Sequence, residues 1–315
     1  MWKQTVKKGL RTGLQTTWSL GKVIFPVTVI VAILSHTPVL EWMVDFVAPL
    51  MSIFGLPGEA AIPLVLGNFV NLYAAIGAIL TLDLTVKEVF IIAMMLSFSH
   101  NLLVESSVVV KVGVRLWLIV AVRVGLAVLA GVLINFFWRG GAEKAQYGLI
   151  PPKEETLTGI WEITADALST AALGVLQLAA IVIPLMIGIQ ILKDLKWFEV
   201  FSKWMAPVTR RLGMKENTSV TLAAGLLFGL AYGAGVMIQA VKEDGVSRKD
   251  ATLAVIFLAA CHAVVEDTLL FAPLGIPVIY LLLIRLTLAI FITMTTAFVW
   301  NRVEFAKGKG ATYEQ

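Results

Sequence analysis

Apolar residues dominate long stretches of the chain, and these stretches recur at similar lengths. A helix needs roughly 20 consecutive apolar residues to cross about 30 Å of hydrocarbon. Runs that meet this requirement lie at 18–35, 60–82, 116–138, 169–192, 218–241 and 278–300. The pattern therefore predicts six membrane spans, and the predicted fold class is an all-α integral membrane protein.

The composition agrees with this prediction. Of the 315 residues, 58% are hydrophobic and 15% are charged, and the mean hydropathy is +0.87. A soluble domain of this length carries more charge on its surface. The single cysteine, Cys261, excludes an internal disulfide and a multi-thiolate metal site. We expect no cofactor, and the absence of a basic stripe with interleaved aromatic residues argues against nucleic acid as a partner.

The chain contains an internal repeat. Residues align at an offset of 158, and after about four extra residues near 242–245 the offset becomes 162. The aligned pairs include Pro26 with Pro184, Gly55 with Gly213, Gly67 with Gly225, His100 with His262, Glu105 with Asp267, Gly113 with Gly275, Arg123 with Arg285 and Trp138 with Trp300. The predicted order is a cytoplasmic N-terminal segment (1–17), a first repeat (18–138), a polar linker (139–166), a second repeat (167–300) and a cytoplasmic tail (301–315).

The positions of lysine and arginine predict opposite orientations for the two copies. Basic short loops tend to remain cytoplasmic. The stretch 38–55 has no basic residue, whereas six cations lie at the matching place, within 193–215. Equivalent loops thus belong on opposite sides of the membrane, which is an inverted-topology repeat. Both termini then lie in the cytoplasm, and the linker lies outside.

An inverted copy must cross the membrane an odd number of times. Three transmembrane helices per copy satisfy this, with an interfacial helix at 38–55 and 196–213. The remaining segments, 86–112 and 248–274, are interrupted by polar residues. We expect each to form a re-entrant or broken polar hairpin that enters and leaves on one side. The alternative, broken helices that cross completely, is disfavoured because it would change the parity.

The ionisable residues at membrane depth occupy equivalent places in the two polar segments. Such groups cost several kcal/mol to insert and usually face a protein interior or a watery cavity. The predicted substrate-binding residues are His100, Asn101, Glu105, His262, Glu266 and Asp267 from these segments, with Asn68 and Asn71 from the second span. The two asparagines are three residues apart and are expected to share one helix face.

Buried arginines need partners because a guanidinium does not lose its charge. Glu105 with Arg123, and Asp267 with Arg285, are the predicted structural ion pairs. Glu266 is then the spare carboxylate, which could carry a coupling proton or cation. His100 and His262 are either satisfied interior histidines or functional groups, because imidazole titrates near neutral pH and binds metal ions.

At the level of these residues the chain resembles the nucleoside-recognition, or Gate-domain, family of membrane modules. The resemblance rests on the first-span proline, an Ala-Pro pair followed by glycine, a glycine-bearing second span and the polar break, and it covers about 20–145 and 165–300. Concentrative nucleoside transporters, the membrane part of the ferrous-iron transporter and spore-maturation membrane proteins share this similarity. The chain departs from the iron transporter in having neither a GxxxxGK[ST] loop nor a cysteine pair.

The resemblance implies a solute-transport fold without naming the solute. We therefore expect a secondary transporter that moves a small polar solute, nucleoside-like or another metabolite, across the bacterial inner membrane through a site between the repeats. A divalent metal ion transporter and a structural or regulatory membrane protein are the alternatives. An enzyme is not expected, because no HExxH, GxSxG or comparable motif is present. The expected partners are a small-molecule or ion substrate and the lipid bilayer, with a second copy of the chain or a partner membrane subunit left open.

Overall fold

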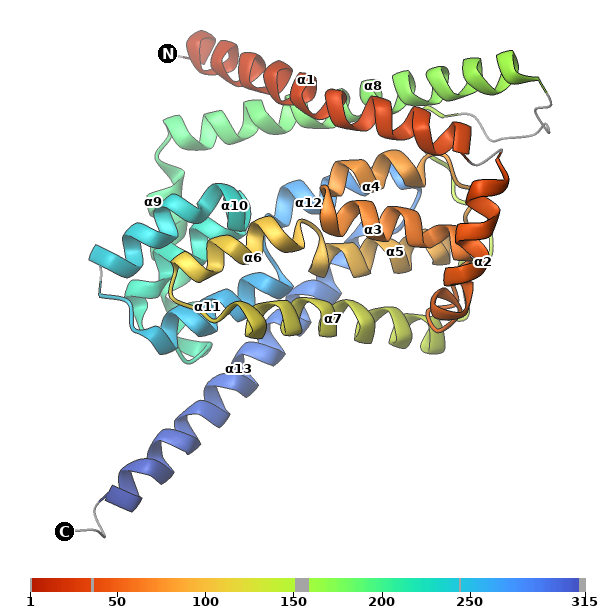
Figure 1. The fold of residues 1–315 in the computed structure, drawn as a ribbon. Coiled ribbons are helices and arrows are strands. Elements are labelled where there is room, and N and C mark those ends of the chain that lie inside the picture. Colours follow the sequence, from red (N-terminus) through yellow and green to blue (C-terminus); the bar gives the residue numbers. More distant parts are fainter. Residues whose placement is uncertain (1, 35–36, 151–158, 244, 312–315) are drawn as a thin grey trace. The chain divides into compact units, whose positions relative to one another are not determined.

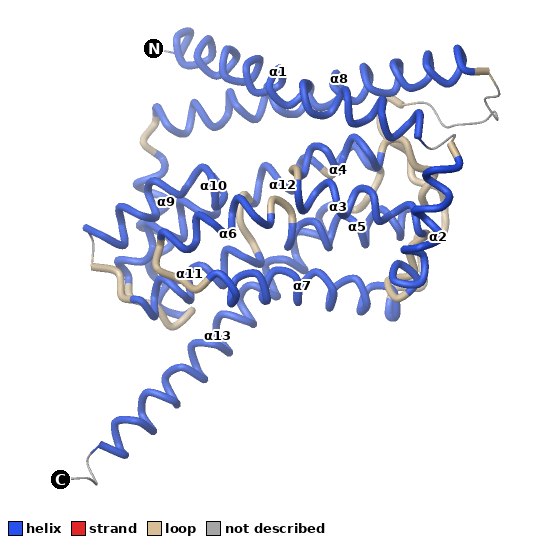
Figure 2. Tube along the Cα trace, viewed as in Figure 1, coloured by secondary structure: helices blue, strands red, loops and turns tan. Residues whose placement is uncertain are grey.

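The structure, a computed structural model, describes residues 2–34, 37–150, 159–243 and 245–311, so part of the predicted linker lies outside it. Regular secondary structure in these ranges is entirely helical (Figure 2). The elements, labelled in Figure 1, are α1 (Trp2–Leu34), α2 (Pro38–Ser52), η1 (Gly58–Ala60), α3 (Ala61–Phe69), α4 (Leu72–Ile79), α5 (Val86–Ser99), α6 (Leu102–Lys111), α7 (Leu116–Phe137), α8 (Ile160–Asp194), α9 (Trp197–Arg211), η2 (Glu216–Thr218), α10 (Ser219–Glu243), α11 (Arg248–Ala260), α12 (Val264–Leu270), η3 (Ala272–Leu274) and α13 (Val278–Ala311).

Six helical segments of the described chain are long and apolar enough to cross a membrane, which confirms the predicted fold class. They are Trp2–Leu34, Val86–Lys111, Leu116–Phe137, Ile160–Leu192, Arg248–Leu270 and Val278–Val303. Four of them overlap the predicted spans. The other two, α5–α6 and α11–α12, are the polar segments.

The chain forms two compact units, and each unit combines parts of both predicted repeats. Unit 1 comprises Met1–Leu103, Val124–Leu195 and Val265–Leu281, and unit 2 comprises Val104–Arg123, Lys196–Val264 and Leu282–Gln315. Nearly all of α6, from the first repeat, therefore belongs to unit 2, and nearly all of α12, from the second repeat, belongs to unit 1. Residues of the two repeats can consequently meet inside either unit.

In unit 1, α1 and α8 lie side by side and run antiparallel (Figure 1). Thr5, near the start of α1, donates a hydrogen bond to Asp194 at the end of α8, and this bond lowers the pKa of the Asp194 carboxyl. Further along α1, Gly21 packs against Val175, which comes earlier in α8. Because α1 and α8 begin the two copies, this antiparallel packing is what an inverted repeat requires.

The apolar run 60–82, predicted as one span, instead forms a hairpin of two short helices in unit 1. Helix α3 ends at Phe69, and Asn71 has an extended backbone (φ −173°) and caps α4 with its side-chain oxygen. A Cβ added at Gly67 would lie 3.1 Å from the Cβ of Ala75. Residues eight apart in one helix are separated by about 12 Å along the axis, so the chain reverses within the run.

Helix α10, in unit 2, reverses in the same way at Gly229, the counterpart of Asn71. Gly229 has φ 75° and ψ 177°, a conformation that interrupts a helix and is accessible mainly to glycine. A Cβ added at Gly233 would lie 3.0 Å from the carbonyl oxygen of Ala224. The run 218–241, also predicted as a span, is therefore a second hairpin.

The end of α7 contacts the chain both before and after the first hairpin. The amide of Asn135 donates to the carbonyl of Ile53 at 3.4 Å, and the carbonyl of Asn135 accepts a bond from Lys87 Nζ at 3.0 Å. Ile53 precedes α3 and Lys87 follows α4. The first hairpin thus begins and ends beside the same end of α7.

The second hairpin has the same relation to α13 in unit 2. A Cβ added at Gly213, before α10, would lie 2.6 Å from the Cβ of Ala297. Lys249, after α10, donates a hydrogen bond to Asn301. Both ends of α10 thus lie beside the C-terminal part of α13.

These contacts show that the segments predicted as spans and the segments predicted as hairpins have each other's structure. The expectation that 86–112 and 248–274 are re-entrant is wrong, because each starts beside the end of the last helix of its copy and leads to that helix's beginning. The segments that reverse as hairpins are instead 60–82 and 218–241. Hydropathy counts apolar residues and does not register a chain reversal. The polar breaks are shielded by packing, since 78% of the residues in an 18-residue stretch of each polar segment are buried. Three segments per copy are long and apolar enough to cross a membrane. The odd number that the prediction from charge requires is therefore kept, and the orientation stays a prediction.

The described part of the linker packs within unit 1. The hydroxyl of Tyr147 donates to the carbonyl of Leu82 at 2.9 Å, and burial raises the pKa of Tyr147. Gly275, which precedes α13, has φ 70°, and a Cβ there would lie 2.6 Å from the carbonyl oxygen of Gln146. Glycine is thus required at this position by backbone conformation and by space.

Candidate functional site

The helices of both polar segments end just before a histidine: α5 ends at Ser99, before His100, and α11 ends at Ala260, two residues before His262. Asn101, after His100, has φ 49°, and Ala263, after His262, has φ 42°. Residues other than glycine rarely adopt this region, and it concentrates at functional sites. The amide of Asn101 donates to the carbonyl of Gly67 at 2.9 Å, and that of Ala263 donates to the carbonyl of Gly225 at 3.1 Å. Each unwound point is thus tied to the hairpin of its own copy.

Both histidines are buried, and both hold one proton in a defined place. Nδ1 of His100 lies 2.7 Å from the carbonyl of Leu96, and Nδ1 of His262 lies 2.7 Å from the carbonyl of Leu258. Because a carbonyl only accepts hydrogen bonds, Nδ1 must carry a hydrogen in each ring. Nε2 is therefore the ring nitrogen that is left to face other groups.

Each Nε2 faces a carboxylate from the other repeat. In unit 2, Nε2 of His262 lies 3.3 Å from Oε2 of Glu105, and in unit 1, Nε2 of His100 lies 4.0 Å from Oδ2 of Asp267. The two contacts are related by the internal repeat.

Glu105 also contacts the buried arginine that the sequence assigned to it. Nη2 of Arg123 donates to Oε2 of Glu105 at 2.7 Å, and both side chains are buried. The counterpart arginine, Arg285, donates from Nη2 to the main-chain carbonyl of His262 at 2.8 Å. Unit 2 therefore brings together a carboxylate, a histidine and two arginines around the break after α11.

Glu266, the predicted spare carboxylate, has a partner that was not among the predicted site residues. The hydroxyl of Tyr73, on α4, donates to Oε1 of Glu266, on α12, at 2.7 Å in unit 1. Both side chains are half-buried. Tyr73 lies two residues after Asn71 in the polar second run, and only the hairpin fold turns it toward the second repeat.

The two asparagines of the first hairpin make local bonds. Asn68 donates from Nδ2 to the carbonyl of Leu64 at 2.7 Å, and Asn71 caps α4 by accepting a bond from the amide of Ala74 at 2.9 Å. The prediction that they share one helix face is wrong, because α3 ends between them. Their predicted contact with a substrate stays a prediction.

The predicted ion pair of Asp267 with Arg285, and the predicted metal site at His100 and His262, each involve residues of different compact units. Asp267 is in unit 1 and Arg285 in unit 2, and the metal-ligand candidates His100 and His262 are divided in the same way. The ion pair and the metal site therefore stay predictions. Next to the two carboxylates, Ser106 and Thr268 occupy counterpart positions, and within the described chain their buried hydroxyl oxygens have no hydrogen-bond partner.

Comparison with known proteins places both copies in one family. The family model for the Gate domain, described as nucleoside recognition, matches residues 17–115 and 175–298. The membrane protein YvoD of Bacillus subtilis (strain 168) is 61% identical over 300 residues, covering 95% of this chain and 96% of the relative. No solved structure shows significant similarity. The chain therefore belongs to the Gate, or nucleoside-recognition, family of membrane proteins.

Proposed function

We propose that this chain is a secondary transporter that moves a small polar solute, nucleoside-like or another metabolite, across the bacterial inner membrane. The observation that carries the proposal is the unwinding of two membrane-length helical segments at a buried histidine that faces a carboxylate of the other repeat. Unwound backbone at membrane depth is tolerated where it is buried in protein or lines a cavity. Transporter folds with inverted repeats bind their substrates at such breaks.

The proposal divides the polar groups into two roles. Tyr73 and Glu266 are half-buried and carry donor and acceptor atoms, so we assign them to solute recognition. The contact of His262 with Glu105 is buried and joins the two repeats, so we assign it to coupling. No chemical change to the solute is part of the proposal.

Uptake into proteoliposomes tests the proposal directly. The purified chain is reconstituted, and uptake of nucleosides, nucleobases and small organic acids is measured with and without a proton gradient. We expect one class to accumulate above protein-free liposomes, and Glu266→Gln to lower that uptake by about tenfold or more. Glu216→Gln is the matched control, because Glu216 lies at the surface in an ion pair with Arg210, and it should retain uptake. No uptake of any class would refute the proposal.

Transport of a divalent metal ion is the second candidate, and the two histidine–carboxylate contacts favour it because imidazole and carboxylate both bind such metals. The same liposomes, loaded with a metal-sensitive dye, distinguish the two. Metal entry that is lost in His262→Ala, without uptake of organic solutes, would support this candidate. If neither organic solutes nor metal ions enter, and the variants are as stable as the parent, the result would favour a structural role.

A further inference from the structure

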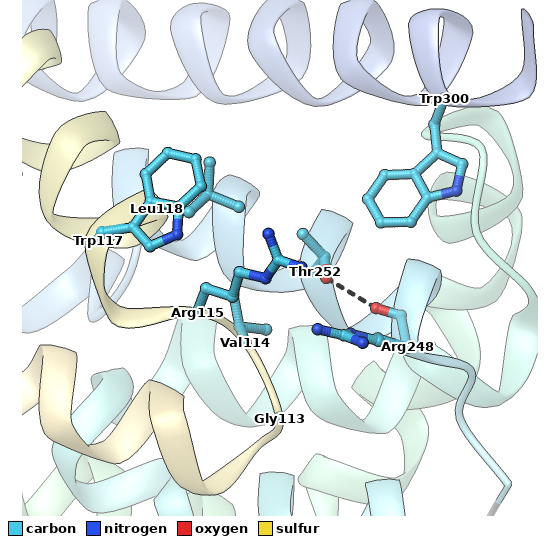
Figure 3. Close-up of a pocket in the computed structure, with 8 residues that line it drawn as sticks. All are labelled: Gly113, Val114, Arg115, Trp117, Leu118, Arg248, Thr252 and Trp300. Carbon is cyan, nitrogen blue, oxygen red and sulfur yellow. Dashed lines mark hydrogen bonds between the residues drawn. The ribbon is translucent and has the colours of Figure 1, made fainter. Parts of the chain in front are cut away.

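A pocket in unit 2 lies apart from the residues assigned to transport. Its volume is about 320 Å³, and it opens where the loop before α7, the first turns of α11 and the end of α13 meet. Two arginines, two tryptophans and a threonine are among the residues that line it. They are Arg115, Trp117, Arg248, Thr252 and Trp300 (Figure 3).

The two arginines form an unbalanced positive site. Figure 3 shows the side chains of Arg115 and Arg248 entering the pocket from opposite sides. Neither forms an ion pair with a carboxylate of the described residues. The nearby acid, Asp250, instead takes part in the cap of α11 and accepts a bond from Ser247 at 2.7 Å. Two like charges that converge without a counter-ion favour the binding of an anion.

The helix ends increase this preference. Arg115 directly precedes α7, and Arg248 is the first residue of α11. The amino end of a helix carries partial positive charge, so an arginine there is unfavourable and an anion is favourable. The amino ends of α7 and α11 both lie at the pocket. The backbone and the side chains therefore both make the electrostatic potential there more positive.

The first copy has different residues at two of the counterpart positions. Thr252 is replaced there by Phe90, Arg248 by Val86, and Trp300 by Trp138. In unit 1 the rings of Phe90 and Trp138 pack edge to face with centroids 5.2 Å apart. The second copy has Thr252 in place of this phenylalanine. The hydroxyl of Thr252 donates a hydrogen bond to the carbonyl of Arg248 at 2.7 Å. The pair of arginines is thus present at only one of the two counterpart places, because Pro277 and Val86 stand at the positions that match Arg115 and Arg248.

We propose that this pocket binds the phosphate of an anionic phospholipid headgroup from the cytoplasmic leaflet. A guanidinium matches phosphate oxygens with two parallel hydrogen bonds. Trp117 is 63% exposed, and exposed tryptophans gather at the boundary between hydrocarbon and water. Basic residues near the end of α13 predict that this side is cytoplasmic, and anionic lipids give that leaflet its negative potential. The site is independent of the solute that the chain transports.

Native mass spectrometry of the detergent-purified full chain tests the assignment. The probes are phosphatidylglycerol, phosphatidylcholine with the same acyl chains, and inorganic phosphate. We expect phosphatidylglycerol to bind at least about tenfold more tightly than phosphatidylcholine, and the double variant Arg115→Ala/Arg248→Ala to lose this preference. Lys203→Ala/Arg211→Ala removes two exposed cations from α9 and should keep it.

Thr252→Phe provides an independent arm, because it recreates the aromatic contact of the first copy and keeps both arginines. It should lower phosphatidylglycerol binding as strongly as the arginine variant. Equal loss in the Lys203→Ala/Arg211→Ala control would show general surface attraction and overturn the proposal. Retained preference in Arg115→Ala/Arg248→Ala would also overturn it, as would inorganic phosphate that displaces the lipid at equal concentration.

Discussion

Each of the two buried histidines lies against a carboxylate that belongs to the other copy. His262 of the second copy faces Glu105 of the first, and His100 of the first faces Asp267 of the second. The sequence indicated the contact of Glu105 with Arg123, because a buried arginine needs a carboxylate. It gave no sign that a histidine would share this carboxylate, since that histidine lies more than 150 residues away along the chain. Because the chain is a repeat, this contact between copies is present twice.

Glu105→Gln should strongly destabilise the protein. The substitution leaves the buried Arg123 without its counter-charge, and breaking a buried pair in this way costs about 3–5 kcal/mol. Glu216→Gln breaks the exposed pair with Arg210 and should cost at most about 1 kcal/mol. Unfolding of both variants by denaturant in detergent measures the difference. Equal losses would mean that the Glu105–Arg123 contact is not a desolvated ion pair.

Among the elements, the helical hairpins depart most from the pattern of apolar residues. Asn71 and Gly229 occupy counterpart positions, and each stops a helix inside a run that is long enough to cross the membrane. Glycine within an apolar run is more often a packing position than a reversal, so the sequence favoured a continuous span. Contacts between the two arms, as between Gly67 and Ala75, show that the chain turns back.

Two counterpart glycines allow a matched test of the connection into the last helix of each copy. Gly113 and Gly275 both have positive φ, of 90° and 70°, but only Gly275 faces backbone, that of Gln146. Gly113→Ala should cost about 1 kcal/mol from backbone strain. Gly275→Ala should cost roughly 1–3 kcal/mol more, because its methyl group would overlap the linker. Thermal unfolding measures both, and equal effects would show that the linker yields without cost.

For the molecule as a whole, compact units and sequence repeats are different divisions of the chain. Unit 2 contains nearly all of α6 from the first repeat, and unit 1 contains nearly all of α12 from the second. Both units consequently contain polar contacts between the repeats, which the repeat boundaries alone do not reveal. The antiparallel packing of α1 and α8 fits the opposite orientations that the basic residues predict.

Cysteine labelling in whole cells tests orientation and hairpin together. In a Cys261→Ser background, single cysteines replace Lys144 in the linker, and Glu216 and Arg248 on either side of α10. We expect a membrane-impermeant maleimide to label Lys144→Cys in intact cells, and to label Glu216→Cys and Arg248→Cys only after permeabilisation. Labelling of Glu216→Cys and Arg248→Cys from opposite sides would show that α10 crosses the membrane as a continuous span.

The sequence by itself determined the membrane class, the internal repeat, the predicted orientation of the copies and the residue types at the site. These properties follow from composition, local hydropathy and charge, which are summed along the chain. The tertiary structure alone decided which segments reverse, because reversal depends on the φ and ψ of single residues such as Gly229. It also decided the partners of His100, His262 and Glu266, because those contacts join residues far apart in the chain, and the pocket at Arg115 and Arg248.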